Sequence, residues 1–311
     1  MITSNQIKIS FEGFWPELNP NAFFVPFVRE ALSCEVIVTE SAESDLVFTS
    51  VFQKSNFGRR LVGLMRRTSG LKPLVHPKSK VPFQKQIWYT GENLRPPIEN
   101  YDLYFSFDSD TYGDTNVYLP YFFTLLDWFE DGQMANSEEG NRAGKIVTPK
   151  AAASSRISNV ADRNDFVCAF VGKPEPTRMR ALAALEKLGN VDIYGSAVGR
   201  PVPDKHSIAQ RYKFMLCFEN DLFPGYVTEK PLEAWVSGCI PLWWGIDSVG
   251  LLNKNAIVNA ASFDSLEAFV SAVGELNLDR NRLARMGSEP LFTREMSLGD
   301  ARDALKRLFN T

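Results

Sequence analysis

The chain has 311 residues, of which 44% are hydrophobic and 23% charged, so its composition is that of a globular protein and excludes a disordered one. Its net charge of -3 at pH 7 lacks the basic excess that is typical of nucleic-acid-binding proteins. At roughly 150 residues per domain, the length predicts two domains or one large α/β domain.

Short β-rich segments alternate with helical patterns through the first half of the chain. The predicted strands are Ile7–Phe11, Val36–Thr39, Leu46–Thr49, Ile87–Thr90 and Leu103–Phe107, and the predicted helices are Phe23–Leu32 and Asn56–Arg67. A loop rich in Pro and Lys is expected over Lys72–Lys85. Strands that alternate with helices predict βα units and a mostly parallel sheet.

The composition changes over Asn136–Asp165, which is rich in Ala, Ser, Asn, Glu and Arg and has no sustained hydrophobic periodicity. Such a segment is typical of a linker or a poorly ordered connection. It lies near the middle of the chain, so we place the domain boundary at residue 150, with one domain over residues 1–150 and another over 151–311. The last helix of the chain is also allowed to pack back on the first domain.

The alternation resumes in the second half. The predicted strands are Phe166–Val171, Val191–Tyr194, Phe214–Phe218 and Ile240–Trp244, and the predicted helices are Arg178–Leu188, Glu229–Ser237, Ser265–Val273 and Leu298–Phe309. Neither half contains the G-x-G-x-x-G pattern of a dinucleotide-binding turn, and Gly172-Lys173 lacks the remaining residues of a P-loop. The fold class expected is therefore α/β, with two Rossmann-like domains that face a cleft.

The four cysteines stand alone in the sequence, without a C-x-x-C pair, and are expected to be buried apolar residues. With only two histidines in the chain, a histidine-rich metal site is excluded. The first ten residues have no signal-peptide pattern, and no apolar stretch is long enough to span a bilayer. These features predict a soluble, cytoplasmic protein with at most peripheral contact at the inner membrane.

The segment Tyr212–Gly245 is the most informative for function. A strand ends at Glu219-Asn220, and Thr228 is expected to cap a helix that opens with Glu229 and Lys230. Ligands of open α/β sheets bind outside the carboxyl ends of the strands, and a helix N-terminus attracts anions. A cation in this first turn indicates a nearby phosphate. The alternative is that Thr228 and Glu229 are cap residues and that the lysine is solvated.

This segment resembles the α-1,3/4-fucosyltransferase family, glycosyltransferase family ten, whose signature is similar to YKFxLxFEN, then YxTEK, then IPxxWG. The matching residues are Tyr212, Lys213, Phe214, Leu216, Phe218, Glu219, Asn220, Tyr226, Thr228, Glu229, Lys230, Ile240, Pro241, Trp244 and Gly245. Pro231 departs from the apolar residue usual after the lysine, but a first helical turn accepts proline. The resemblance is to the bacterial type, because the membrane anchor that opens vertebrate members has no counterpart here.

Two other segments support the resemblance. Phe170–Leu185 resembles the strand, loop and helix in which an arginine of the family meets the donor diphosphate, and Arg178 falls at that position, with Arg180 as a nearby competitor. In the first half, the YTGEN segment resembles the one that supplies the catalytic base in bacterial members, and Glu92 matches this base. The resemblance extends over Phe166–Gly245 and Ile87–Pro120.

The resemblance implies a GT-B fold and inverting transfer of L-fucose from GDP-β-L-fucose to an N-acetylglucosamine-containing or related bacterial surface glycan, through an α-1,3-type linkage. The acceptor, an oligosaccharide or a glycolipid, would bind the first domain, and the GDP-sugar would bind the second. Glu92 is the implied base. Arg178 and Lys230 would neutralise the departing GDP, and the other donor-binding residues implied are Asn220, Tyr226, Thr228 and Glu229. No cofactor or metal ion is implied.

Several alternatives stay open. Asp108-Ser109-Asp110 has the D-x-D pattern of metal-dependent glycosyltransferases, but solvated loop carboxylates are the favoured interpretation. The aromatic stretch Tyr118–Phe129 is expected in the core, although Tyr121 or Trp128, like Glu12 or Trp15, is a candidate for contact with the acceptor. For the function, the alternatives are a different GDP-deoxyhexose donor and a non-catalytic protein that binds sugar nucleotides or glycans.

Overall fold

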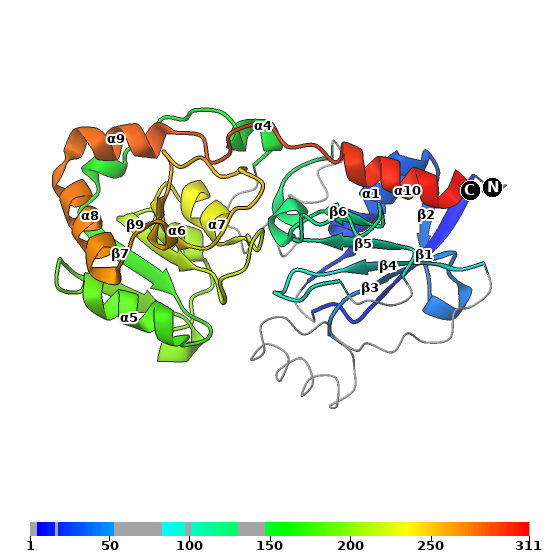
Figure 1. Ribbon diagram of the computed structural model, residues 1–311, viewed down its shortest axis with the longest axis horizontal. Coiled ribbons are helices and arrows are strands. Elements are labelled where there is room, and N and C mark those ends of the chain that lie inside the picture. The colour runs from blue at the N-terminus through cyan, green and yellow to red at the C-terminus, as the bar shows by residue number, and fades with distance from the viewer. Residues whose placement is uncertain (1–4, 16–17, 53–82, 97–100, 130–146, 311) are drawn as a thin grey trace. The chain divides into compact units, whose positions relative to one another are not determined.

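The computed structural model describes residues 5–15, 18–52, 83–96, 101–129 and 147–310 (Figure 1). The chain divides into two compact units. Unit 1 comprises Met1–Thr124, Phe129–Glu139 and Ser297–Thr311, and unit 2 comprises Leu125–Trp128 and Gly140–Met296. In this division the last fifteen residues belong to unit 1, an arrangement that the sequence analysis allowed for the last helix, and residues 140–150 belong to unit 2.

Unit 1 is built on a parallel sheet, which among the described residues has six strands in the order β2-β1-β3-β4-β5-β6. The strands are β1 (Gln6–Glu12), β2 (Glu35–Val38), β3 (Leu46–Thr49), β4 (Lys85–Tyr89), β5 (Leu103–Ser106) and β6 (Asn116–Tyr118). Helices α1 (Asn21–Leu32) and α10 (Gly299–Asn310) lie side by side against this sheet (Figure 1). Strands β3 and β5 are largely apolar and buried, as is typical of parallel strands that are covered on both faces.

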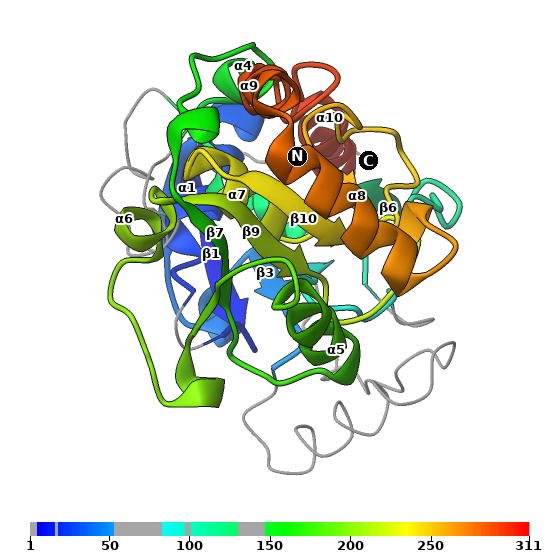
Figure 2. The same ribbon diagram turned by 90° about the vertical axis from the view of Figure 1, so that its left-hand side faces the viewer.

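Unit 2 is built on a second parallel sheet, with five described strands in the order β11-β10-β9-β7-β8. The strands are β7 (Asp165–Phe170), β8 (Val191–Tyr194), β9 (Tyr212–Phe218), β10 (Ile240–Trp244) and β11 (Val258–Asn259). Helices α5 (Pro176–Leu185) and α8 (Leu266–Leu278) cover one face of the sheet, and α6 (Lys205–Ala209) and α7 (Lys230–Val236) cover the other (Figures 1 and 2).

The core of unit 2 follows from the alternation of side chains along its strands. Val167 and Ala169 of β7, with Phe214 and Leu216 of β9, point to the face that α5 and α8 cover, and all are buried. The intervening residues, such as Met215, are buried too. Because both faces of the sheet are covered, its polar chemistry is confined to the ends of the strands.

The predicted strands and helices of the described residues are present, with ends that shift by a few residues. Five of the described strands and α-helices were missed: β6, helix α4 (Pro149–Ala152), α6, β11 and helix α9 (Arg280–Ser288). The predicted helix Asn56–Arg67 and nearly all of the predicted loop Lys72–Lys85 lie outside the described residues. All four cysteines are free and buried, as expected. Within the part of the chain that is described, no helix has the length and hydrophobicity needed to cross a membrane.

The prediction of a linker over Asn136–Asp165 is wrong for the described residues from 147 onwards. These form helix α4 (Pro149–Ala152) and pack on unit 2, where Val160 is fully buried. Arg156 donates to the carbonyl groups of Trp235 and Gly287, and Arg163 donates to those of Tyr212 and Ser237. Hydrogen bonds from these arginines to backbone carbonyl groups hold the segment in place. Because such bonds do not require a repeating pattern of apolar residues, the sequence carries no sign of this order.

Candidate functional site

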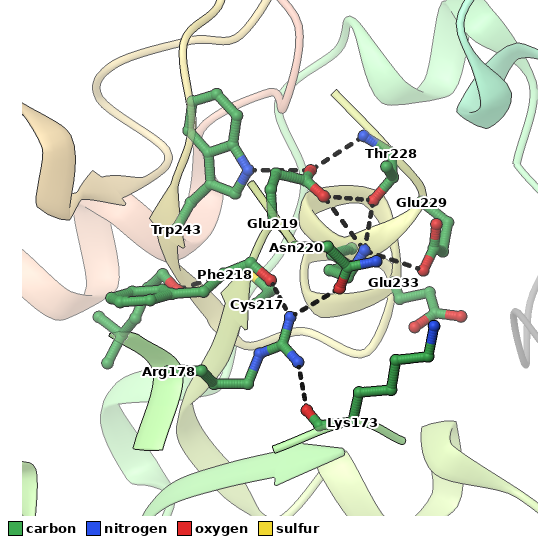
Figure 3. Close-up of polar contacts among 12 residues, drawn as sticks. Lys173, Arg178, Cys217, Phe218, Glu219, Asn220, Thr228, Glu229, Glu233 and Trp243 are labelled. Carbon is green, nitrogen blue, oxygen red and sulfur yellow. Dashed lines mark hydrogen bonds and ion pairs between the residues drawn. The ribbon is translucent and has the colours of Figure 1, made fainter. Parts of the chain in front are cut away.

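The residues predicted to bind the donor gather in unit 2, at the carboxyl ends of β7, β9 and β10. Strand β9 ends at Phe218, opposite Trp244 of β10, and Glu219 and Asn220 follow it directly. The loop that comes next leads to Lys230, the first residue of α7. Figure 3 shows how side chains from these elements meet.

Glu219 is the centre of this cluster, and its side chain is fully shielded from solvent. Oε1 accepts hydrogen bonds from the backbone N–H of Thr228 at 2.9 Å and from the indole Nε1 of Trp243 at 3.2 Å. Oε2 accepts from the Thr228 hydroxyl at 2.7 Å (Figure 3). It also accepts from Lys230 Nζ at 3.1 Å. A buried carboxylate is stable only when it is paired and hydrogen-bonded, and these four donors meet that condition.

Lys230 reaches into the cluster from the first turn of α7, with 19% of its side chain exposed. Its ammonium group donates to Glu219 Oε2 and, at 2.8 Å, to the Thr228 hydroxyl oxygen. Glu229 Oε1 lies 3.5 Å away, which is an ion pair too long for a good hydrogen bond. Burial alone acts to lower the pKa of Lys230, but the carboxylates of Glu219 and Glu229 hold this pKa well above its usual range.

The prediction that Thr228 caps the helix is wrong. The N-cap residue is Glu229, which makes no side-chain capping bond, and the Thr228 hydroxyl is committed to Glu219. Thr228 instead joins Glu219 to Lys230. Burial acts to raise the pKa of the Glu229 carboxyl, but the ammonium groups of Lys230 and Lys205 outweigh it and lower this pKa. Glu229 therefore remains ionised beside the lysine.

Arg178 projects from the first turn of α5 toward the end of β9 and is 6% exposed. Its guanidinium donates to the carbonyl oxygen of Lys173 at 2.9 Å, to that of Phe218 at 2.8 Å and to Asn220 Oδ1 at 3.0 Å (Figure 3). Burial lowers the pKa of Arg178. Arg178 thus ties three segments of the edge together and orients Asn220, a structural function that was not foreseen.

Two further residues complete the surroundings of α7. Tyr226, predicted to contact the donor, is buried at 2% exposure in the loop before the helix. One turn into α7, Glu233 pairs with Lys205 of α6 at 3.1 Å. Burial raises the pKa of the Glu233 carboxyl. A second ion pair therefore joins α7 to α6.

Glu92, the predicted base, lies in unit 1, in the loop after β4. The Thr90 hydroxyl accepts from the Glu92 N–H at 3.1 Å and donates to the Glu92 carbonyl at 2.9 Å. A Cβ atom added at Gly91 would lie 2.6 Å from the ring of Trp15 and 3.1 Å from that of Tyr121. The loop that carries Glu92 is therefore pinned by Thr90 and packed against two aromatic rings, as a well-placed catalytic group requires.

The interpretation of Asp108 as a solvated carboxylate is wrong. Asp108 is 6% exposed, accepts a 2.5 Å hydrogen bond from the Tyr112 hydroxyl and lies 3.4 Å from Arg95 Nε. Asp110, by contrast, is exposed, and it accepts from the backbone N–H of Tyr112. Among the described residues, no group of three or more His, Cys, Asp or Glu side chains is arranged to hold a metal ion.

Sequence reasoning assigned no function to Glu219 or Trp243. A signal for Glu219 was present, since a carboxylate directly after a buried apolar strand needs donors from its surroundings. For Trp243 there was none, because its sequence position is that of an ordinary strand residue. The structure thus brings Arg178, Asn220, Thr228, Glu229 and Lys230 together, and adds Glu219 at their centre.

Comparison with solved structures shows which fold the chain shares. A crystal structure of an alpha1,3-fucosyltransferase matches with a TM-score of 0.68 and 21% identity over 98% of this chain and 90% of that chain. One of alpha1,3-fucosyltransferase with GDP-fucose matches with a TM-score of 0.69 and 21% identity over 100% and 93%. With its two parallel sheets, the protein has the α/β fold of the GT-B type, as predicted.

Sequence comparison gives a match to a family model and to named relatives. Residues 160–286 match the model of the glycosyltransferase family 10 (fucosyltransferase) C-terminal domain, which confirms the predicted resemblance. The chain is 28% identical to the alpha-(1,3)-fucosyltransferase FucT of Helicobacter pylori over 63% of this chain and 45% of the relative. It is also 28% identical to the human 3-galactosyl-N-acetylglucosaminide 4-alpha-L-fucosyltransferase FUT3, over 67% and 56%. The chain thus spans about half the length of these relatives.

Proposed function

We propose that this chain is an inverting glycosyltransferase that moves L-fucose from GDP-β-L-fucose to a hydroxyl of an N-acetylglucosamine-containing or related glycan, with an α-1,3-type linkage. The observation that carries the proposal is the buried cluster of Glu219, Thr228 and Lys230, which holds an ammonium group at the carboxyl edge of a parallel sheet. The names of the relatives and the GDP-fucose complex of a protein with the same fold support this donor.

On the donor side, Lys230 has two N–H groups in hydrogen bonds, and the third has only the long contact with Glu229. A phosphate oxygen is a better acceptor at that position, so the diphosphate takes this N–H and releases Glu229 to accept from the ribose hydroxyls. Arg178 uses three hydrogen bonds within the protein, of the five that a guanidinium can donate, so donors remain for the phosphates.

On the acceptor side, Glu92 takes the proton of the acceptor hydroxyl as its oxygen attacks the anomeric carbon of fucose. The bond between that carbon and the phosphate oxygen breaks, and GDP leaves with the bonding electrons. Because one displacement inverts the anomeric centre, the β-linked donor gives an α-linked product. The charge that develops on GDP is stabilised by Lys230 and Arg178, so we propose that the reaction needs no metal ion.

We place the reaction in the cytoplasm, which the four free, buried cysteines support. The acceptor is then an oligosaccharide or a glycolipid presented there.

The experiment that tests the proposal is incubation with GDP-fucose and a panel of other GDP-sugars, each with an oligosaccharide array, followed by detection of released GDP and of labelled glycan. Transfer from GDP-fucose supports the proposal. Transfer from another GDP-deoxyhexose alone would change the donor, and binding of GDP-fucose without transfer to any acceptor would make the chain a binding protein. Linkage analysis of the product decides whether the bond is α-1,3.

A further inference from the structure

We infer that Glu219 is the positioning residue of the donor site, and that it fixes the ammonium group of Lys230 where the diphosphate of a GDP-sugar binds. The inference rests on the proposed function. The place of Glu219 in the sequence indicated no function, whereas its contacts with Thr228 and Lys230 indicate a positioning role.

Glu219 has no free acceptor site for a ligand. Each of its two oxygens accepts two hydrogen bonds, and two lone-pair directions are what a carboxylate oxygen offers. The side chain is also fully shielded from solvent. Glu219 therefore acts on a bound donor only through the groups that it holds.

The groups that Glu219 holds come from three separate parts of unit 2. Trp243 belongs to β10, Thr228 to the loop before α7, and Lys230 to α7 itself. Glu219 follows β9, the strand between β10 and β7 in the sheet. One carboxylate thus fixes the loop and the start of α7 against the edge of the sheet.

The contacts among Glu219, Thr228 and Lys230 form a closed ring. Lys230 Nζ donates to both of the others, and the Thr228 hydroxyl, which has one hydrogen, donates it to Glu219. The direction of every bond in the ring is therefore determined. A lysine side chain has several rotatable bonds and loses conformational entropy when it is fixed. Because the ring already fixes Lys230, the free energy of GDP-sugar binding does not include this loss.

The opposite charges of Glu219 and Lys230 are a second reason to treat them as a pair. A carboxylate without solvent access needs a cation, and Lys230 forms an ion pair with it. In return, the carboxylate keeps the lysine protonated in spite of its burial. The two residues form a unit, and this unit predicts a coupled response to mutation.

The test is a double-mutant cycle on GDP affinity, measured by calorimetry on the full chain with Glu219→Gln, Lys230→Met and the double variant. If Glu219 acts through Lys230, Glu219→Gln weakens GDP binding about tenfold in the wild-type background and less than about twofold when Lys230 is already Met. A matched control is Glu233→Gln. It removes another buried carboxylate, which lies on α7 like Lys230 and pairs with Lys205 of α6. The control lowers the melting temperature and leaves GDP affinity within about threefold of wild type.

Additive losses in the cycle would overturn the inference, because Glu219 would then act independently of Lys230. Unchanged GDP affinity with a lowered melting temperature would reduce Glu219 to a structural residue. If Glu219→Gln does not fold, Thr228→Val takes its place, since it opens the ring and keeps both charges. That variant weakens GDP binding severalfold if the inference holds and leaves it unchanged if it does not. A wild-type chain that fails to bind GDP would overturn the proposed function, and this inference with it.

Discussion

Arg95 Nε lies 3.4 Å from Asp108 Oδ2, so an ion pair joins the loop that carries Glu92 to the loop that follows β5. Arg95 is three residues beyond Glu92, and Asp108 is itself held by the Tyr112 hydroxyl. The second aspartate of the D-x-D pattern takes no part in this ion pair. The pattern therefore has a structural explanation in this protein, and its two carboxylates are not equivalent.

We expect Asp108→Asn to lower the stability of the chain by about 1–3 kcal/mol, because an amide at this position loses the ion pair with Arg95 and offers Tyr112 a poorer acceptor. The matched control is Asp110→Asn, which is exposed and keeps an oxygen for the Tyr112 N–H. Calorimetric melting of the two variants checks the prediction. Equal melting temperatures would mean that the contacts of Asp108 with Arg95 and Tyr112 contribute nothing to stability.

Arg178→Ala is expected to lower kcat/KM for GDP-fucose by about 10²–10³-fold, since a cation that stabilises the departing diphosphate contributes roughly 2–4 kcal/mol. The variant should also melt at a lower temperature, because the carbonyl groups of Lys173 and Phe218 lose their donor. Arg180→Ala, two residues along the same helix and exposed, is the control and should match wild type in both measurements. A loss of activity in Arg180→Ala alone would reverse the assignment.

Burial, and then the neighbouring Tyr104, raise the pKa of Tyr101 from 10.0 to about 12. Between these values the unfolded chain loses the phenol proton and the folded chain keeps it, so the stability of the folded state falls as the pH rises from 10 to 12. The loss attributable to Tyr101 reaches roughly 2–3 kcal/mol once the pH passes 12, because the two pKa values differ by about two pH units. Denaturant titrations at several pH values should give a flatter profile for Tyr101→Phe. Identical profiles would contradict the raised pKa.

The sequence predicted most of the fold because buried parallel strands are short apolar runs between helical patterns, as in Phe214–Phe218. It failed where order depends on polar contacts. Arg156 and Arg163 fix their segment through carbonyl groups far along the chain, and a sequence does not show which carbonyl an arginine will reach. In the site, Lys230 was predicted from its residue type and its place in a first helical turn, and Arg178 from the family resemblance. The sequence does not show the direction of each hydrogen bond, so Thr228 was interpreted as a cap and Glu219 was given no function.

Chelation tests the proposal that the reaction needs no metal. We expect activity to persist in excess EDTA, because two cations are assigned to the diphosphate and Asp108 is committed to Arg95 and Tyr112. The measurement is the initial rate of transfer before and after dialysis against the chelator. Complete loss that Mn²⁺ restores would show that a metal ion, and not Lys230 with Arg178, stabilises the departing group.

The assignment of Glu92 predicts a separation between chemistry and donor binding. Glutamine keeps the shape of the side chain and removes its basicity, while the bonds of Thr90 to the backbone of residue 92 remain available. We therefore expect Glu92→Gln to lower kcat by about 10²-fold or more and to leave the affinity for GDP-fucose nearly unchanged. Steady-state kinetics and calorimetric donor titration on both proteins measure the two quantities.

Glu12→Gln, a change in a second half-buried glutamate of unit 1, should be made in parallel. A loss of donor affinity in proportion to the loss of rate would make Glu92 a donor ligand or a residue needed for folding. An unchanged kcat in Glu92→Gln with a large loss in Glu12→Gln would transfer the role of base to Glu12. Asp108 is a poorer candidate for the base than Glu12. Its carboxylate already pairs with Arg95 and accepts a hydrogen bond from the Tyr112 hydroxyl.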